Sequence, residues 1–317
     1  MGTVLVTGGA GFLGRHVARS LADAGEQVVI TYRRYFSAPQ LLSDIMESKV
    51  KAVRCDLNDL PELSRVIRDH SVDSIVHAAT VSNYEATIYT CLQNNILGTI
   101  NVMEAAAIGS VKKVTYISSG QALVGPERRA AESEAESVPI ASPAFGDTPP
   151  SKKCGEVLSL YYGATFGISI VIVRPGLLYG PYGEAQIRNL KELREIMEGV
   201  VAGKPVDLPD IGKEDQLTLT YVRNSAAGIA LVHRAPQNQH LVYNTADQKP
   251  YTWGEIAEII KELVPGSTIT FGKSSQPARA QLPPEKLNIV SEFGYKPKYG
   301  LREALQEYID WHKNGRT

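Results

Sequence analysis

A glycine-rich segment near the N-terminus has the spacing of a phosphate-binding loop. It reads TGGAGFLG over residues 7–14, between an apolar run and an amphipathic stretch. Gly8 permits a tight turn, Gly11 lets the backbone approach a pyrophosphate, and Gly14 allows a helix to pack closely on a sheet. The following helix would present N–H groups and a positive dipole to the phosphates. The segment therefore predicts a dinucleotide site, and a glycine turn without ligand is the alternative.

A second polar segment follows the next apolar run and bears on which dinucleotide binds. NAD-selective sites usually place an Asp or Glu there, to bind the ribose 2′-hydroxyl. This chain has Arg33 and Arg34 instead. Two guanidinium groups suit a 2′-phosphate through charged hydrogen bonds and stacking on adenine. We therefore expect NADP(H) to be favoured over NAD(H); a solvated loop with two surface arginines is the alternative.

The elements that position these residues alternate regularly in the first half of the chain. Short β-branched runs predict buried strands at 3–6, 27–31, 51–54, 74–77, 113–118 and 169–173. Amphipathic stretches predict helices at 15–24, 61–69, 93–107 and 152–166. This alternation predicts the α/β class, a Rossmann doubly wound parallel sheet covered on both faces.

The second half changes character after residue 175. Helices are expected at 190–202, 225–233, 252–263 and 301–313, with strands at 216–221 and 239–244 and Pro-rich connections between them. This pattern predicts a smaller α+β substrate lobe. We place the dinucleotide domain at 1–175 and about 217–247, and the lobe at about 176–216 and 248–317.

Composition excludes several classes of partner. The 317 residues carry a net charge of −1, so no charge excess recruits nucleic acid or a membrane surface. The three cysteines are widely spaced and fit neither a disulfide framework nor a metal site. The start of the chain lacks the basic region of a signal peptide. We expect a soluble, cytoplasmic protein with a small-molecule substrate and no metal.

Further motifs occur in a fixed order along nearly the whole chain. They are Cys55-Asp56-Leu57, His77-Ala78-Ala79, Asn95-Ile96-Leu97-Gly98-Thr99, Tyr116-Ile117-Ser118-Ser119, Ser151-Lys152 with Glu156, Arg174-Pro175, Leu178-Tyr179-Gly180-Pro181, Phe293-Gly294-Tyr295-Lys296-Pro297 and Gly300-Leu301-Arg302-Glu303-Ala304-Leu305. Together with the glycine loop, this set resembles the extended short-chain dehydrogenase/reductases, also called the NAD-dependent epimerase/dehydratase family. No single match is specific, but the ordered set is.

The resemblance implies a role for each matching position. It implies pyrophosphate contacts from Gly8, Gly11, Phe12 and Leu13, and an adenine site at Asp56 and Leu57. It implies that Ala78, Ala79 and Thr80 line the cofactor and that Lys152 bonds the nicotinamide ribose. Pro175, Leu177 and Leu178 would meet the carboxamide side. Asn95 and Ser118 complete the expected cofactor site.

The family's acid–base residue is absent. It is usually a Tyr four residues before the Lys, and this chain has Thr148 there; an insertion would align Phe145 instead. The carbonyl-polarising Ser or Thr falls on Gly120. Losing such a proton-transfer group typically removes about 10²–10⁴-fold in rate. We expect a water held by Ser118, Ser119 or Thr148, an acidic substrate group, or Tyr84 to supply the proton; an ordinary loop aromatic is the alternative for Tyr84.

The expected substrate lobe also departs from the family pattern. Leu217 and Gln276 stand where sugar-nucleotide enzymes carry diphosphate-binding arginines, and Leu177 replaces an Asn, although Arg279 could reach a phosphate. These changes favour an atypical NADPH-dependent ketoreductase for a hydrophobic, aromatic or polyketide-like ketone, with catalytic residues Lys152, Thr148, Ser119 and Tyr84. The alternatives are an epimerase, dehydratase or isomerase that recycles its nucleotide, and a cofactor-binding pseudoenzyme.

The resemblance also implies an oligomeric state. Residues 93–107 and 152–166 correspond to helices that often build a two-fold dimer interface in the family. A homodimer is therefore expected, although ordinary core packing would give the same sequence pattern.

Overall fold

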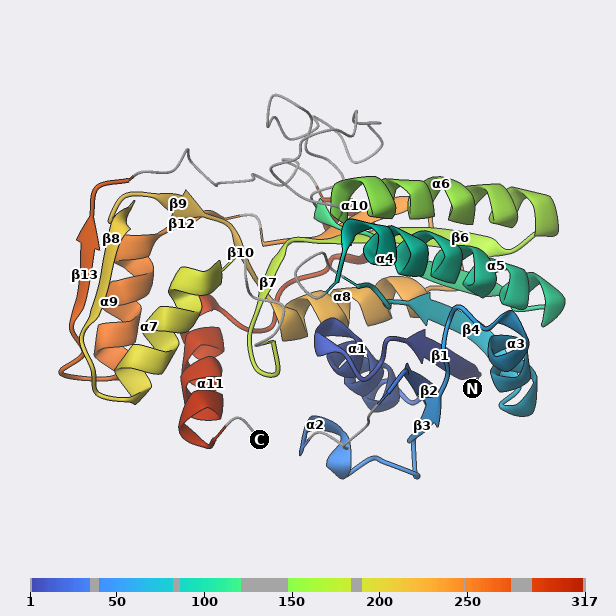
Figure 1. Ribbon diagram of the computed structural model, residues 1–317, viewed down its shortest axis with the longest axis horizontal. Helices are drawn as coiled ribbons and strands as arrows, with labels where there is room; N and C mark the ends of the chain where they lie inside the picture. The colour runs from blue at the N-terminus through green and yellow to red at the C-terminus, as the bar shows by residue number, and fades with distance from the viewer. Residues whose placement is uncertain are drawn as a thin grey trace.

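The computed structural model describes residues 2–34, 40–81, 86–120, 148–183, 190–247, 249–274 and 287–315, apart from the side chains of residues 148 and 149. Within these ranges a large sheet with helices on both faces lies beside a smaller lobe (Figure 1). None of the helices in these ranges combines the length and apolarity needed to cross a membrane.

The large sheet has seven parallel strands. They are β1 (Thr3–Thr7), β2 (Gln27–Tyr32), β3 (Val50–Arg54), β4 (Val72–His77), β5 (Lys113–Ile117), β6 (Ser169–Pro175) and β11 (Val242–Thr245). Their order across the sheet is β11-β6-β5-β4-β1-β2-β3. The chain reverses its direction of winding between β1 and β4, and such a switch point opens a ligand crevice at the carboxyl ends of the strands. The predicted fold class is confirmed.

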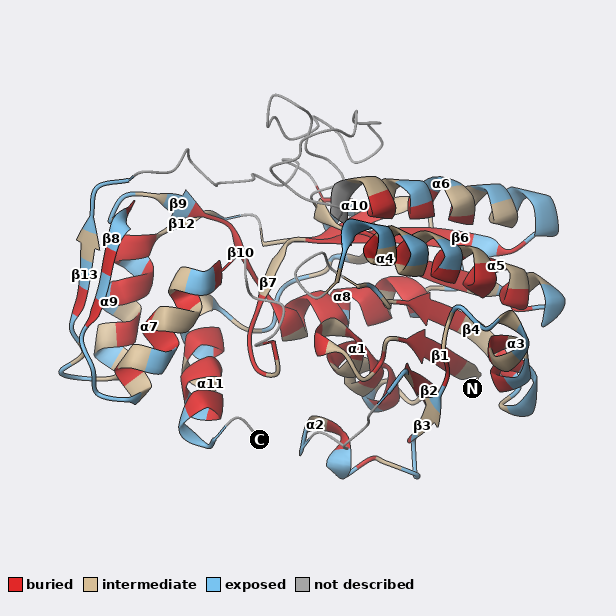
Figure 2. Cartoon of the chain, viewed as in Figure 1, coloured by how far each residue is buried: buried red, intermediate tan, exposed pale blue. Residues whose placement is uncertain are grey.

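Helices cover both faces of this sheet and bury its Val- and Ile-rich strands (Figure 2). One face packs against α1 (Phe12–Asp23), α2 (Gln40–Ser43), α8 (Val222–Arg234) and α10 (Asn288–Phe293). The other face packs against α3 (Leu60–Asp69), α5 (Gly98–Ile108) and α6 (Thr148–Phe166). Strands buried on both faces have no polar side to alternate with, which explains their continuous apolar runs.

The helix predicted at 93–107 is instead a composite element. It begins as α4 (Ile88–Leu92), widens into a π-helical turn, η1 (Gln93–Leu97), and continues as α5. Asn95 lies within this turn, and its side chain bonds both backbone groups of Val81, N–H to Oδ1 and Nδ2–H to the carbonyl oxygen, each at 2.8 Å. A π turn adds one residue and re-aims its side chains, a feature frequent at functional sites.

In its described residues the lobe has three short strand pairs and three helices. β7 (Leu177–Tyr179) pairs with β10 (Leu219–Tyr221), β9 (Gln216–Leu217) with β12 (Tyr251–Thr252), and β8 (Val206–Gly212) with β13 (Ile269–Gly272). Its helices are α7 (Lys191–Val201), α9 (Trp253–Leu263) and α11 (Leu301–Lys313). The strand predicted at 216–221 is divided between two of these pairs.

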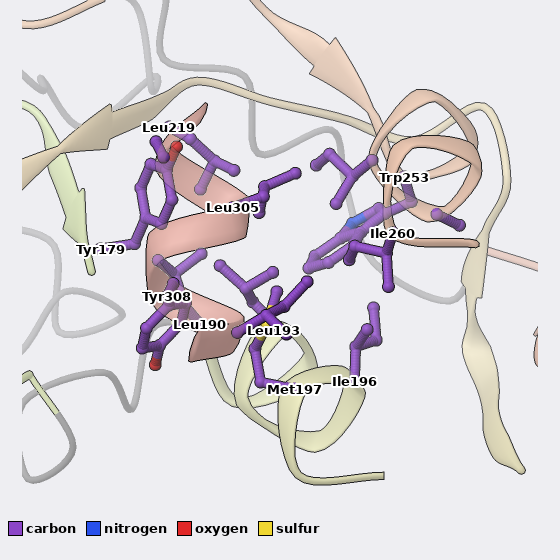
Figure 3. Close-up of a cluster of buried hydrophobic side chains, with 14 of the residues drawn as sticks. Tyr179, Leu190, Leu193, Ile196, Met197, Leu219, Trp253, Ile260, Leu305 and Tyr308 are labelled. Atoms are coloured by element: carbon purple, nitrogen blue, oxygen red, sulfur yellow. The ribbon is translucent and has the colours of Figure 1, made fainter. Parts of the chain in front are cut away.

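The apolar faces of α7, α9 and α11 meet in one core. Figure 3 shows Leu193 and Met197 from α7 converging with Ile260, Leu305 and Tyr308. Burying a side chain of this size contributes roughly 1.5–3 kcal/mol, so this cluster holds the lobe together.

Contacts also join the lobe to the sheet domain. Phe12, in the first turn of α1, packs into the lobe core. In the other direction, Leu287 and Ile289, which lie within the predicted lobe range, pack in the core under the large sheet. The start of α1 is therefore held between the two parts of the molecule.

Candidate active site

The glycine loop between β1 and α1 forms a tight backbone cradle. Gly8 has φ +67°, a conformation that favours glycine, and a Cβ there would lie 2.6 Å from Cα of Ala79. A Cβ on Gly14 would lie 2.2 Å from the carbonyl oxygen of Gly8. Among the described residues no side chain caps the start of α1, and its first turn has no acidic residue. The cradle therefore fits a dinucleotide pyrophosphate at a positive helix end.

Arg15 supplies a positive charge beside this cradle. Its Nε donates to the carbonyl oxygen of Gly11 at 3.1 Å, and Nη2 donates to that of Ala10. Its guanidinium also lies 5.3 Å from the ring centroid of Tyr182. Burial lowers the pKa of Arg15, but an arginine remains charged at neutral pH. Arg15 is thus a candidate pyrophosphate residue that the sequence analysis missed; its position directly after the third glycine was the available signal.

A polar bridge joins the segments after β2 and β3 to η1. Nη1 of Arg33 donates to Oδ1 of Asn94 at 3.0 Å, and Nδ2 of Asn58 donates to the same oxygen at 3.1 Å. Asp56 accepts the backbone N–H of Asn58 at 3.0 Å, which shapes the turn after β3. Arg33 is therefore held against the Asn58 and Asn94 side chains.

A buried chain of hydrogen bonds supports the loop after β4. His77 contacts Oγ1 of Thr7 at 2.7 Å through Nδ1 and Oγ1 of Thr99 at 3.0 Å through Nε2. Burial lowers the pKa of His77 to about 3, so its ring is neutral. Ala78 to Thr80 follow His77 in the chain. At the end of this segment Thr80 Oγ1 donates to Asn95 Oδ1 at 3.3 Å. The predicted cofactor-lining residues thus lie on a rigid support.

Lys152 lies in the first half of α6 and is almost wholly buried, with 5% of its surface exposed. Its Nζ donates to the carbonyl oxygen of Ile117 at 2.8 Å and lies 5.5 Å from the ring centroid of Tyr116. Burial lowers the pKa of Lys152 to about 8, although Glu156 opposes this effect. The ammonium group is therefore at the carboxyl end of β5, where the fold places its ligand crevice.

Glu156, one turn further along α6, anchors that helix to the sheet. Burial alone would raise its pKa, but hydrogen bonds and charge from Arg174, together with Ser118 and Lys153, hold the pKa of Glu156 below its usual value. Ser118 Oγ donates to Oε1 at 2.6 Å, and Lys153 Nζ donates to Oε2 at 3.2 Å. Ser118 is therefore engaged by a carboxylate, and the sequence analysis gave no role to this network.

The predicted carboxamide-side residues lie where the chain leaves the sheet. Pro175 ends β6, and Leu177 and Leu178 belong to β7, which pairs with β10. Leu177 packs partly against the lobe core, and Leu217 is buried in it. Leu217 therefore contributes to the packing of the lobe, at the position where the resemblance implied an arginine.

Some predicted residues cannot be placed in the site. Tyr84, Gln276 and Arg279 lie outside the described residues, and so does the side chain of Thr148. Ser119 follows Ser118 at the end of β5 and is partly buried, and Arg34 is exposed at the end of β2. In the described ranges no group of three or more His, Cys, Asp or Glu side chains could hold a metal ion.

The fold and this cradle define a Rossmann protein of the extended short-chain dehydrogenase/reductase class. Residues 4–246 match the model of the NAD dependent epimerase/dehydratase family, and the chain belongs to this family. The predicted resemblance is confirmed.

Individual relatives are distant but span almost the whole chain. UDP-glucuronate 4-epimerase 6 of Arabidopsis thaliana is 24% identical, over 98% of this chain and 71% of its own length. The UDP-glucose 4-epimerase of Thermus thermophilus, solved with NAD, is 24% identical, with a TM-score of 0.74 and coverage of 99% and 100%. The dTDP-glucose 4,6-dehydratase of Bacillus anthracis str. Ames, solved with NAD, is 21% identical, with a TM-score of 0.79 and coverage of 99% and 97%.

Two predictions are wrong. The solved neighbours bind NAD, which overturns the expected preference for NADP(H); physically, the Arg33 guanidinium that was expected to bind a 2′-phosphate bonds Asn94 instead. The relatives are epimerases and a dehydratase, which overturns the ketoreductase of hydrophobic ketones. The ketoreductase prediction depended on the absence of the family's catalytic Tyr. The absence of that side chain does not reveal which neighbouring group carries the proton.

Proposed function

We propose that this chain is an NAD-dependent epimerase or dehydratase that keeps its nucleotide bound and uses it as a recycled redox group. The observation that carries the proposal is the glycine cradle. A Cβ on Gly8 would collide with Ala79, and a Cβ on Gly14 would collide with Gly8. The cradle lies at the switch point of the sheet, at the same edge as Lys152, which bonds the last residue of β5. Family membership over residues 4–246 adds the class of reaction.

The chain's own residues divide the work of binding. Gly8, Gly11 and the first turn of α1 would hold the pyrophosphate, with Arg15 balancing its charge. Asp56 and Leu57 would flank the adenine, and Ala78 to Thr80 would line the path towards the nicotinamide. Lys152 and the segment from Pro175 to Leu178 would lie at the reacting end. Bound NAD⁺ would supply reversible removal of a hydride from a substrate carbon.

The proposed substrate is a small hydroxyl-bearing molecule of the nucleotide-sugar class. The named relatives act on UDP-glucuronate, UDP-glucose or dTDP-glucose. In this chain Leu217 is buried in the lobe core, so a diphosphate would be bound by other residues.

Two measurements test the proposal together: whether the purified protein retains its cofactor, and whether it converts a substrate without net oxidation or reduction. The purified protein should release NAD(H) on denaturation. It should also convert a member of a panel of UDP- and dTDP-sugars into an epimer or a dehydrated keto sugar, detected by NMR, with no net change in absorbance at 340 nm. A protein that binds no NAD(H), or that consumes reduced nucleotide in proportion to product, would contradict the proposal.

One observation favours a second candidate, a cofactor-binding protein without catalysis. Thr148 and Gly120 stand where the resemblance implies the two proton-handling residues. This candidate predicts micromolar NAD(H) binding together with inertness towards the whole sugar panel.

We also propose a homodimer through α5 and α6. Val157 and Tyr161 of α6, one turn apart, are 60% and 66% exposed, and Phe166 and Ile108 are also exposed near the ends of these neighbouring helices. Exposed apolar side chains grouped in this way are typical of a protein interface. Light scattering should give twice the chain mass, and Tyr161→Glu should halve it; a monomeric wild type would exclude the dimer.

A further inference from the structure

Few described groups near the end of β5 can carry a proton. Ser118 donates to Glu156, whose other oxygen accepts from Arg174 and Lys153. Burial raises the pKa of Tyr116 far above neutrality, and its hydroxyl donates to the carbonyl oxygen of Lys152 at 3.4 Å. These groups are therefore engaged or unable to ionise at neutral pH.

His77 is also unsuited to the task. Both of its ring nitrogens are occupied, by Thr7 on one side and Thr99 on the other. Its pKa is lowered to about 3, by burial and by the charge of Lys152. The ring therefore stays neutral at neutral pH and remains within its own hydrogen-bond chain.

Lys152 differs from all of these groups. Within the described part of the chain its ammonium has one hydrogen bond, to the carbonyl oxygen of Ile117, and no ion pair. The two carboxylate oxygens of the nearest acidic group, Glu156, accept hydrogen bonds from Arg174, Ser118 and Lys153 instead. The titratable groups that face Lys152 are Tyr116 on β5, His77 on β4 and Glu156 on α6, and only Glu156 favours its charged form.

The consequence is a lysine that exchanges its proton easily. Burial without an ion-pair partner penalises the ammonium form and brings the pKa of Lys152 to about 8. Proton transfer is most effective when the pKa of the catalytic group lies near the working pH. The side chain also has a flexible four-carbon stem and three donor hydrogens, so it can turn from Ile117 to a ligand at the same edge of the sheet.

We propose that Lys152 is itself the acid–base residue of this chain, taking over the proton transfer that the missing tyrosine performs in the family. This inference rests on the proposed function. It differs from the role that the resemblance implies for Lys152, which is to hold the ribose.

In the proposed reaction a proton moves between the substrate and Lys152 while a hydride moves between the substrate and the nicotinamide. The neutral amine of Lys152 accepts the proton of a substrate hydroxyl, and the O–H bond breaks as a C=O bond forms. Bound NAD⁺, held by the glycine cradle, would accept the hydrogen on that carbon together with its electron pair. In an epimerase the electron pair and hydrogen return to the other face of the carbon, and the ammonium of Lys152 returns the proton to oxygen.

Direct titration of the amine tests this proposal without any turnover. With ¹³Cε,¹⁵Nζ-lysine in the intact protein, NMR should show two amines that titrate near pH 8, because burial lowers the pKa of both Lys113 and Lys152 to about 8, and Lys152→Arg should remove the Lys152 signal. Lys112→Arg, a change of an exposed lysine, should leave it in place. If the Lys152 amine titrates at the ordinary value of about 10.4, the proposal is overturned.

Variant kinetics complete the test. Arginine keeps the positive charge but cannot release its proton near neutral pH. Lys152→Arg should therefore bind NAD within about threefold of the wild-type affinity while kcat falls at least about 100-fold. The rise of wild-type kcat with pH through about 8 should disappear. Lys152→Met, which is closer in volume, guards against misfolding of the Arg variant.

The outcomes separate this inference from the proposed function. If the wild type turns over a substrate and Lys152→Arg retains its kcat within threefold, Lys152 only holds the cofactor, and the inference alone is overturned. If the wild type binds NAD but converts no substrate, the proposed function and the inference are both overturned.

Discussion

Glu156 of α6 and Arg174 of β6 form a bidentate ion pair that is almost wholly buried. Nε of Arg174 donates to Oε1 at 2.7 Å, and Nη2 donates to Oε2 at 2.7 Å. The side chains of Arg174 and Glu156 are 2% and 4% exposed. Because Glu156 lies one turn after Lys152, this pair fixes the helix that carries the proposed acid–base group to the strand that leads into the substrate lobe.

Removing one partner of this pair should destabilise the protein strongly. Arg174→Met leaves the buried carboxylate of Glu156 with Ser118 and Lys153 but without its bidentate partner, and breaking a buried pair costs about 3–5 kcal/mol. Urea unfolding followed by circular dichroism measures this cost. As control, Lys191→Met breaks the exposed pair of Lys191 and Glu195 and should cost less than about 0.5 kcal/mol. A cost below about 1 kcal/mol for Arg174→Met would show that the pair does not anchor α6.

The cradle should not tolerate a methyl group on its third glycine. In Gly14→Ala the new Cβ would lie 2.2 Å from the carbonyl oxygen of Gly8, so the backbone of the loop has to move. We expect NAD affinity, measured by calorimetry, to fall at least about tenfold, a loss of about 1.4 kcal/mol. Gly98→Ala is the matched control, because its Cβ would meet only Cβ of Leu57, at 3.6 Å. Equal affinities in the two variants would refute the steric argument.

Arg15 should contribute to cofactor binding through its charge. Arg15→Met keeps much of the packing against Tyr182 but removes the guanidinium beside Gly11. Because a charged group beside a phosphate attracts it over several ångströms, we expect NAD binding to weaken roughly tenfold and to become less sensitive to salt. Salt-dependent binding curves measure both effects. An unchanged affinity at low salt would remove Arg15 from the site.

Mildly acidic solutions should destabilise the fold through its buried histidines. Burial lowers the pKa values of His16, His77 and His233 to about 3. The unfolded chain binds protons at these rings below about pH 6.5, whereas the folded chain does not until about pH 3. Their stabilising contribution is therefore complete above pH 6.5 and is lost as pH falls towards 3, by about 1.4 kcal/mol per pH unit for each ring.

Unfolding free energies at pH 7.5 and 5.5 measure this slope. His233→Gln, which can still contact Ser74 and Thr115, should make the loss on acidification smaller. His240→Gln, at an exposed position, should leave the slope unchanged. If stability rises as the pH falls from 7.5 to 5.5, these rings are not buried in their neutral form.

The sheet domain could be predicted from sequence because its signals are local. Each β-branched run became a strand, and the glycine loop lies where its spacing indicated. The lobe was harder, since β8 and β13 form a parallel pair whose partner residues lie 60 to 63 positions apart in the sequence, and neither strand was predicted. The same holds for the helix predicted at 93–107, whose π turn places Asn95 in contact with Val81. No periodicity reveals a contact of this kind.

The chemistry of the site was predicted in part. The motif matches located Lys152, but no acidic side chain among the described residues pairs with it, because Arg174, Ser118 and Lys153 share Glu156. These residues come from α6 and two strands, and their meeting is a property of the fold. The cofactor prediction from Arg33 was wrong for the same reason. Its hydrogen-bond partner, Asn94, is 61 residues away in the sequence.

The fate of a deuterium label at the reacting carbon tests the proposed function most directly. The purified protein would be incubated with UDP- and dTDP-sugars carrying deuterium at C4, without added nucleotide, and the products analysed by NMR and mass spectrometry. We predict a product that keeps the label within the sugar, either at the inverted C4 or transferred to another carbon, while absorbance at 340 nm stays constant. Loss of the label from the sugar with a matching rise in absorbance at 340 nm, or no conversion of any sugar by protein that contains NAD, would contradict the account.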